Sequence, residues 1–250
     1  MKLGVLGVGH LAATLLKGWD RAGVDPARVI LSPRGHGPDL AAARGYGLAA
    51  DNADLVARAD LVVLAVRPAA AVPAVTGLPW RAGQVILSAC AGVPIAALAQ
   101  AAPGARVVRI MPLTAAEIGR SPTAIHPDDP QARPWVDMLG PVIPLPREEA
   151  FEIATVSAAI YGWAQDLIAR SAGWSAAQGL EAETARLLVA RTFEAAGALL
   201  ATRPEPMEQL LQDLVTPGGI TERGLQVLGA AAVPEAWDAA CQAVLDRLRG

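Results

Sequence analysis

The sequence predicts an α/β protein in which an open, doubly wound parallel sheet is followed by an all-helical domain. Up to residue 145, short runs rich in Val, Ile and Leu alternate with longer Ala- and Leu-rich segments. Several of these runs are apolar at every position, as strands buried on both faces of a parallel sheet are. Beyond residue 147 the runs stop and long Ala-rich segments follow.

The expected strands are separated by helical segments such as residues 10–23 and 93–102, which is the βαβ pattern with right-handed crossovers. These strands cover residues 2–7, 28–32, 60–66, 84–89, 105–111 and 141–145. Two long helices are then expected within residues 147–173 and 175–203, with Gly173 and Pro204 as breaks. We therefore expect two domains, residues 1–147 and 148–250.

Composition excludes several classes of protein. The chain has 250 residues, of which 53% are hydrophobic but only 4% aromatic, so we expect a core of Ala, Val, Leu and Ile. A net charge of -3 with no basic stripe argues against nucleic acid as a partner. The apolar runs are too short to span a bilayer, and no secretory cleavage segment follows the N-terminal one.

Cys90 and Cys241 lie in unrelated contexts without a CxxC motif, and we expect two buried thiols in a reducing compartment. His36 and His126 have no third ligand at metal-binding spacing, so no metal site is expected. Together these observations predict a cytoplasmic protein.

The N-terminal segment GVGHLA, residues 7–12, matches the dinucleotide-binding fingerprint with Ala in the third glycine position. Gly7 would allow the tight turn, Gly9 would let the backbone approach a pyrophosphate, and Ala12 would let the helix pack close to its strand. The helix N-terminus would then offer free N–H groups to an anion. The alternative is a purely structural turn, since GxGxxA occurs by chance in Gly- and Ala-rich chains.

The end of the second strand decides which dinucleotide is expected. An NAD-binding protein usually has an acid there, about 20 residues past the glycines, to hold the ribose 2′-hydroxyl. This chain has Ser32 and Arg34 instead, with no carboxylate before Asp39. A guanidinium can fork onto phosphate oxygens, so we expect NADPH. The alternative for Arg34 is an ordinary solvated loop arginine.

Six segments carry a family resemblance. They are GVGHLA, SPR at 32–34, LAVRP at 64–68, SACAGVPIAAL at 88–98, VRIMPLTAA at 108–116 and TPGGITERGL at 216–225. Their order and spacing resemble the pyrroline-5-carboxylate reductases over nearly the whole chain. The resemblance implies a Rossmann domain and a helical domain through which subunits form a homodimer or larger homo-oligomer. It also implies NADPH-dependent reduction of the C=N bond of a cyclic imino acid, the last step of proline biosynthesis.

The resemblance implies functional residues at matching positions. Its cofactor-binding residues correspond to Gly7, Gly9, His10, Leu11, Ala12, Ser32, Arg34, Asn52, Ala65, Val66, Arg67 and Pro68. Its substrate-binding residues correspond to Met111, Pro112, Gly218, Gly219, Ile220 and Thr221. The Pro-Gly-Gly turn also suits this role on physical grounds, because N–H groups at a helix start can hold a carboxylate. The alternative is that Pro-Gly-Gly is only a common turn.

The chain departs from the family on the substrate side. The family's MPNTP is MPLTA here, with Leu113 and Ala115, its SGSGPAY corresponds to TVSAAIY at 155–161, and its helix hydroxyl falls on Ala164. An unpaired polar atom of the substrate would cost about 1–3 kcal/mol. Pyrroline-5-carboxylate is then expected to be a poor substrate, unless a shift of register returns the hydroxyl of Ser157 to the site.

Three candidate proton donors remain for the imine nitrogen: Thr221, Tyr161 and Asp166. The alternative for Asp166 is a surface carboxylate, and Tyr161 could equally be a packing residue. Two rivals to the family reading also remain open. One is a reductase of the same fold that acts on a different imine or ketone, and the other is a nucleotide-binding dimer without turnover.

Overall fold

The computed structural model describes all 250 residues and divides into two compact units. We call residues 1–158 with 248–250 the α/β unit, and residues 159–247 the helical unit. Helix α7 (Phe151–Ala177) begins in the first unit and continues into the second. Each unit is described by itself below.

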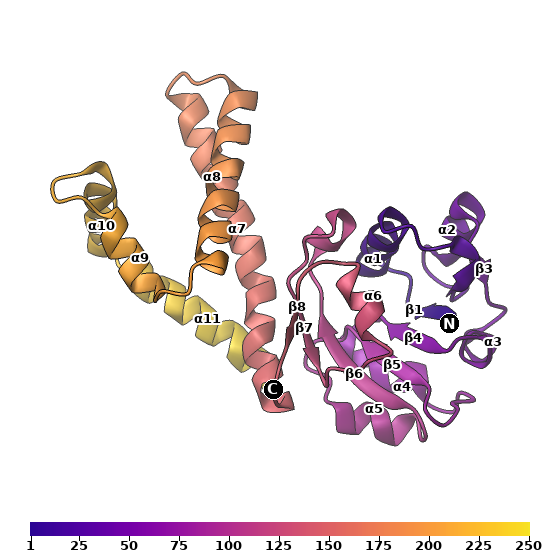
Figure 1. The fold of residues 1–250 in the computed structure, drawn as a ribbon. Coiled ribbons are helices and arrows are strands. Elements are labelled where there is room, and N and C mark those ends of the chain that lie inside the picture. The colour runs from indigo at the N-terminus through magenta and orange to yellow at the C-terminus, as the bar shows by residue number, and fades with distance from the viewer. The chain divides into compact units, whose positions relative to one another are not determined.

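The α/β unit contains one eight-stranded sheet in the order β3-β2-β1-β4-β5-β6-β7-β8 (Figure 1). The strands are β1 (Leu3–Leu6), β2 (Val29–Leu31), β3 (Gly47–Leu48), β4 (Leu61–Leu64), β5 (Val85–Ser88), β6 (Arg106–Met111), β7 (Thr123–His126) and β8 (Val142–Pro144). All six expected strands are present, and no strand follows Pro144. The two missed strands are β3, which has only two residues, and β7, which has four.

The expectation of an all-parallel sheet is wrong at one edge, because β7 pairs antiparallel with β6 and the sheet is therefore mixed. A parallel connection needs a crossover of a dozen or more residues, usually with an α-helix. Residues 112–122 between these strands contain only the short 3-10 helix η3 (Thr114–Ile118). Strand β8 runs parallel to β7.

Helices cover both faces of the sheet, as a doubly wound fold requires. One face packs against α1 (His10–Arg21), α2 (Gly37–Arg44) and α6 (Arg133–Asp137), and the other against α3 (Asn52–Arg58), α4 (Ala71–Val75) and α5 (Ile95–Ala101). On the first face the rings of Trp19 and Trp135 meet edge to face, with centroids 5.9 Å apart. The remaining 3-10 helices are η1 (Pro26–Arg28), η2 (Pro68–Ala70) and η4 (Glu148–Ala150).

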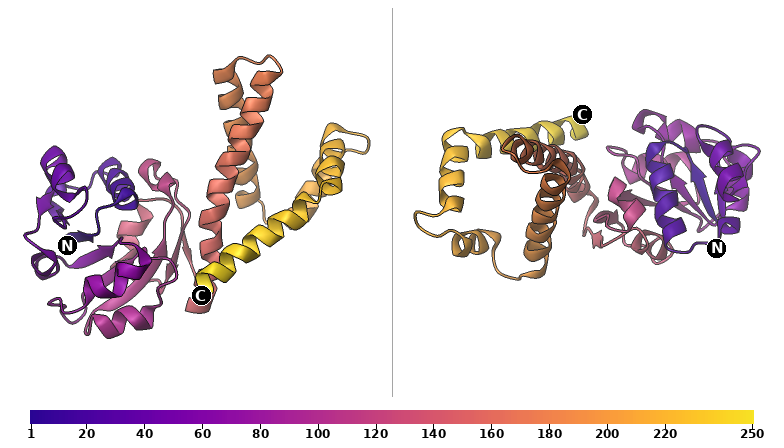
Figure 2. Two further views of the ribbon diagram at one scale, coloured as in Figure 1. Left: turned by 180° about the vertical axis from the view of Figure 1, so that it is seen from behind. Right: turned by 90° about the horizontal axis from the view of Figure 1, so that it is seen from above.

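All elements of the helical unit are helices (Figures 1 and 2). After α7 come α8 (Ala182–Thr202), α9 (Met207–Leu214), α10 (Ile220–Ala230) and α11 (Val233–Arg249). The expected break at Gly173 is wrong: α7 continues to Ala177, because one glycine costs a helix only about 1 kcal/mol. The chain turns instead at Gly179, whose φ is +101°. Helix α8 ends before Pro204, as expected.

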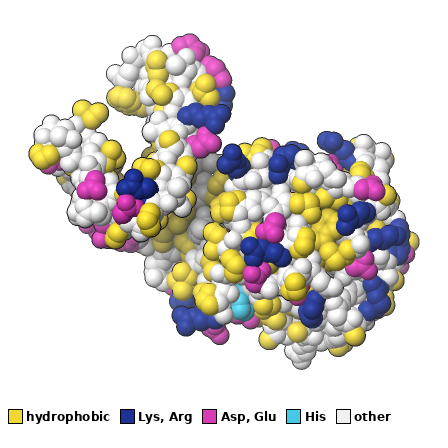
Figure 3. Space-filling view, viewed as in Figure 1, with side chains coloured by type: hydrophobic (Ala, Val, Ile, Leu, Met, Phe, Trp, Pro, Cys, Tyr) yellow, Lys and Arg dark blue, Asp and Glu magenta, His cyan; other side chains and the backbone are white.

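The helical unit buries little of its apolar surface. Within α8 only Ala185 is buried, and the rings of Trp163 and Trp237 join α7 to α11 with centroids 5.4 Å apart. Large apolar side chains that stay more than a third exposed include Trp174, Leu187, Leu188, Leu199, Met207, Leu211, Leu214 and Ile220. Apolar side chains are visible at the surface of this unit in Figure 3. No helix of the chain is both long enough and apolar enough to cross a membrane.

Candidate functional site

The glycine-rich segment forms the connection between β1 and α1. Gly7 has a φ of +92°, a region that favours glycine. A Cβ atom at this position would lie 2.5 Å from Cγ1 of Val66 and 2.8 Å from the carbonyl oxygen of Ala65. Gly7 is therefore required both by its backbone conformation and by the close approach of the chain after β4.

Gly9 has a different role, because a Cβ atom there would meet nothing within 4 Å. It is the N-cap residue of α1, where no side chain caps the helix and the first turn holds no acid. The N–H groups of His10 and Leu11 have no acceptor within the chain and lie at the positive end of the helix dipole. His10 is exposed, Leu11 is half-buried and Ala12 is fully buried. This arrangement fits a bound pyrophosphate.

Ser32 follows β2 and is only 2% exposed. Its Oγ accepts a hydrogen bond of 3.3 Å from the backbone N–H of Gly7, so Ser32 braces the glycine turn. Its hydroxyl proton remains available for an anion. Gly37 brings the start of α2 close to this residue, since a Cβ there would lie 2.0 Å from the carbonyl oxygen of Ser32. The sequence analysis did not predict this close contact. The two glycines of GHG at residues 35–37 could have indicated it.

A cavity of about 390 Å³ opens beside the glycine turn. It brings together five of the expected cofactor residues: Gly7, Ser32, Arg34, Asn52 and Val66. The sequence reading missed the other lining residues, which are Leu6, Ala70, Pro73, Ala74, Thr76 and Leu78. A second cavity of about 360 Å³ shares Arg34, Asn52 and Leu78 with the first. Two cavities that share an arginine in their linings suit a phosphorylated nucleoside.

Arg34 is a free cation on the wall of both cavities. Its exposed guanidinium makes no hydrogen bond or ion pair within the chain, and no carboxylate lines the first cavity. Asp51 lines the second cavity, but its Oδ1 accepts a hydrogen bond of 2.8 Å from the N–H of Asp54 and caps α3. The hydrogen bond from the N–H of Ala50 and the ion pair with Arg58 lower the pKa of Asp54. These carboxylates are engaged, whereas Arg34 is available for a phosphate.

The expected residues after β4 lie at the same edge of the sheet. Ala65 and Val66 are half-buried, while Arg67 and Pro68 are exposed at the start of η2. The thiol of Cys90, after β5, donates to the carbonyl oxygen of Val66 at 3.4 Å. Burial raises the pKa of this thiol, so it stays protonated at neutral pH and can donate. The loops after β4 and β5 are thereby joined.

Met111 and Pro112 lie at the end of β6 and are buried. Met111 packs against Phe151 at the start of α7. Leu113, one of the departures from the family pattern, is only 8% exposed, and its N–H donates to Oγ of Ser121 at 2.8 Å. This segment is therefore held firmly in the α/β unit.

The Pro-Gly-Gly turn precedes α10 in the helical unit. The N–H of Gly218 donates to Oε2 of Glu222 at 2.7 Å, and that of Gly219 donates to the carbonyl oxygen of Thr216 at 2.8 Å. The N–H groups of Ile220 and Thr221, the first two residues of α10, have no acceptor within the chain. Two donors at a helix start thus remain for an anion.

The three candidate proton donors lie in the helical unit. Tyr161 is half-buried on α7, and Thr221 is half-buried in the first turn of α10. Asp166 is exposed on α7, and its Oδ2 pairs with Nε of Arg170 at 2.5 Å, one helical turn away. Asp166 thus has the surroundings of a surface carboxylate, whereas Thr221 adjoins the free N–H groups of the turn.

The fold and the cavity define a Rossmann-type dinucleotide-binding protein with a helical C-terminal domain. Residues 145–250 match the family model described as pyrroline-5-carboxylate reductase dimerisation, and residues 2–92 match the one described as NADP oxidoreductase, coenzyme F420-dependent. The pyrroline-5-carboxylate reductase of Pseudomonas aeruginosa is 30% identical and is matched over 96% of this chain and 94% of its own length. The chain belongs to the pyrroline-5-carboxylate reductase family, which confirms the resemblance seen in its motifs.

Other relatives agree with this assignment. The pyrroline-5-carboxylate reductase of Methanosarcina acetivorans is 28% identical over 94% of this chain and 92% of its own length. The crystal structure of Plasmodium falciparum pyrroline carboxylate reductase with NADP bound has the same fold, with a TM-score of 0.86 at 21% identity. That comparison covers 100% of this chain and 97% of the Plasmodium chain.

Proposed function

We propose that this protein reduces the C=N bond of pyrroline-5-carboxylate with NADPH. The observation that carries the proposal is the cavity beside the glycine turn, with the unpaired Arg34 on its wall, in a chain that belongs to this family over nearly its full length. The cofactor supplies the hydride when it is bound. The protein must therefore bind, orient and shield the reactants.

The cofactor would be held by three groups of the α/β unit. The N–H groups at the start of α1, beside Gly9, receive the pyrophosphate. Arg34 and the hydroxyl of Ser32 receive the 2′-phosphate. Asn52 lines both cavities and would contact the adenosine. The preference for NADPH over NADH follows from the free cation at Arg34.

The substrate carboxylate would be held by the N–H groups of Ile220 and Thr221. The imine nitrogen needs a proton as the adjacent carbon receives the hydride. We assign this donor to the hydroxyl of Thr221, because it adjoins the carboxylate-binding turn, whereas Asp166 is engaged by Arg170. Thr221→Ser should then retain turnover, and Thr221→Val should lose most of it.

We further infer that the protein is a homodimer formed through the helical unit. An apolar recess of about 660 Å³ lies between α8 and α9, lined by residues that include Leu199, Met207, Leu211 and Leu214. These side chains are between 45% and 66% exposed in the single chain. Large contiguous apolar surface of this kind is normally covered by a partner. The family model matched over residues 145–250 supports a second copy as that partner.

The departures on the substrate side favour one rival, a reductase of another imine. Ile220, at the start of α10, is 94% exposed and adds an apolar group beside the turn that would bind the carboxylate. A neutral cyclic imine would bind more tightly because of the apolar Ile220 side chain. An imino acid would instead bind more tightly because the free N–H groups hold its carboxylate. The two functions therefore differ in whether the substrate needs a carboxylate.

Initial rates of NADPH consumption separate these functions. The panel consists of pyrroline-5-carboxylate, the same ring without its carboxylate, and a 2-oxo acid. We expect the highest kcat/KM for pyrroline-5-carboxylate, because the N–H groups of Ile220 and Thr221 remain free for its carboxylate. This replaces the expectation of a poor substrate that the departures at Leu113 and Ala164 suggested. A higher value for the neutral ring would favour the rival function. Binding of NADPH without turnover of any compound would show a nucleotide-binding dimer that is not an enzyme.

A further inference from the structure

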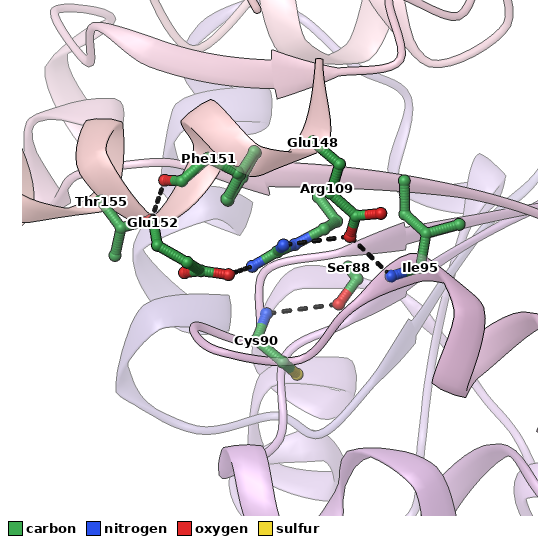
Figure 4. A network of polar contacts seen from close by, with 8 residues as sticks. All are labelled: Ser88, Cys90, Ile95, Arg109, Glu148, Phe151, Glu152 and Thr155. Atoms are coloured by element: carbon green, nitrogen blue, oxygen red, sulfur yellow. Dashed lines mark hydrogen bonds and ion pairs between the residues drawn. The ribbon is translucent and has the colours of Figure 1, made fainter. Parts of the chain in front are cut away.

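Arg109 is a buried cation in the middle of β6, beside Ser88 of β5. Its side chain is 2% exposed, and its guanidinium lies 4.1 Å from the centre of the Phe151 ring. One nitrogen pairs with Oε1 of Glu148 at 3.1 Å, and another pairs with Oε1 of Glu152 at 2.7 Å (Figure 4). Arg109 thereby joins the sheet to η4 and to the first turn of α7.

The network leaves two buried polar atoms without a partner, Nε of Arg109 and Oε2 of Glu152. Buried ion pairs seldom stabilise a fold more than apolar residues of similar volume would, and unsatisfied atoms make the balance worse. Stabilisation of the fold is therefore a weak explanation for the burial of Arg109. The network around Arg109 connects three separate segments of the chain, which suggests that it fixes their positions.

The third segment is the loop of residues 89–94 between β5 and α5. Oε1 of Glu148 accepts a hydrogen bond of 2.7 Å from the N–H of Ile95, directly after this loop (Figure 4). At the other end, the thiol of Cys90 donates its single proton to the carbonyl oxygen of Val66 at 3.4 Å, and the carbonyl oxygen of Leu64 lies 3.6 Å from the same sulfur. The loop is thus held at both ends, and one end depends on the pair of Arg109 and Glu148.

The place of this loop in the fold gives it a function. Dinucleotides bind across the carboxyl ends of the strands in such sheets. Arg34 follows β2 and the glycine turn follows β1, so the adenosine half and the pyrophosphate occupy that side. The nicotinamide half must then extend toward the carboxyl ends of β4 and β5. The loop of residues 89–94 follows β5 and lies at that end.

We propose that Arg109 and Glu148 are positioning residues for hydride transfer. They hold the loop of residues 89–94 against the reactive half of the cofactor without touching the cofactor themselves. This inference rests on the proposed function. A misplacement of about 1 Å at a reacting centre can lower a rate by about 100-fold, so partial release of one loop end should cost about tenfold.

The test compares Glu148→Ala with Glu148→Gln. The alanine variant removes the acceptor for the N–H of Ile95, whereas the glutamine variant retains a side-chain oxygen there. Arg109→Met is less informative, because it leaves two carboxylates without their cation and the protein could fail to fold. Val136→Ala is the matched control for lost stability. Val136 is fully buried on α6, in the core cluster on the opposite face of the sheet.

The first measurement is amide hydrogen exchange of the protein without cofactor. Glu148→Ala should raise exchange at Ile95 and across residues 89–93, Glu148→Gln should restore protection, and Val136→Ala should leave this loop unchanged. Unchanged exchange in Glu148→Ala, or an equal increase in Val136→Ala, would overturn the proposal. This readout does not depend on the substrate, so it stands even if the proposed function fails.

The second measurement separates the two halves of the cofactor site. Glu148→Ala should lower kcat for pyrroline-5-carboxylate by about tenfold, in line with the positional tolerance of such reactions. Its affinity for 2′,5′-ADP, which carries only the adenosine half, should remain that of the unmodified protein. Unchanged kcat, or parallel loss of kcat and 2′,5′-ADP affinity, would overturn the proposal. Absence of turnover in the unmodified protein would instead refute the proposed function.

Discussion

Replacement of Arg34 by alanine should remove the preference for NADPH over NADH. Hydrogen bonds to a charged group contribute about 1.5–3 kcal/mol. Because the Arg34 guanidinium is exposed, solvent screening reduces this to about 1–2 kcal/mol. The dissociation constant for NADPH should therefore rise about 5- to 30-fold. The constant for NADH should not change, since NADH has no 2′-phosphate.

Titration of cofactor fluorescence measures both constants, and three further variants sharpen the result. Arg34→Lys keeps the charge but not the planar fork, so it should give an intermediate loss. Arg34→Asp should repel the 2′-phosphate and reverse the order of affinities. Arg44→Ala, at the exposed end of α2 and away from the cavity, should change neither constant. Equal weakening of NADPH and NADH by Arg34→Ala would refute the assignment.

Three other predictions follow from separate features. Gly9→Ala should leave the melting temperature unchanged, because its Cβ meets no protein atom, yet weaken NADPH binding by obstructing the pyrophosphate; unchanged binding would contradict this. Burial, and then the hydrogen bond to Asp20, raise the pKa of Tyr46 above its unfolded value of about 10. Its stabilising effect is thus complete below about pH 10 and declines above it, so urea unfolding of Tyr46→Phe should show a smaller alkaline loss than the unmodified protein. Leu211→Glu should convert the homodimer to a monomer in light scattering, and a monomeric unmodified protein would exclude the proposed interface.

Much of the α/β unit could be predicted from the sequence because its signals are local. Runs such as LVVL at residues 61–64 are short, apolar at every position and rich in β-branched residues, which favours strands buried on both faces. The turn at Gly7 and Gly9 could also be recognised, since its glycines occur at fixed spacing between a strand and a helix. These features depend on neighbouring residues and need no knowledge of distant ones.

The features that were missed depend on contacts between distant segments. Strand β7 runs antiparallel because its connection lacks a helix, and a short run such as TAIH does not reveal its direction. Thr76 and Leu78 reach the cofactor cavity from a loop with no motif of its own. Arg109 left a visible signal, a charge within the apolar run of β6, but its partners Glu148 and Glu152 could only be found in three dimensions.

Transfer of isotopic label tests the proposed reaction most directly. NADPH carrying deuterium at both C4 positions is mixed with pyrroline-5-carboxylate and the protein, and the product is analysed by mass spectrometry. The proposed function predicts proline with one deuterium at the carbon that formed the C=N bond. Proline without deuterium, or no proline at protein concentrations that bind the cofactor fully, would contradict it.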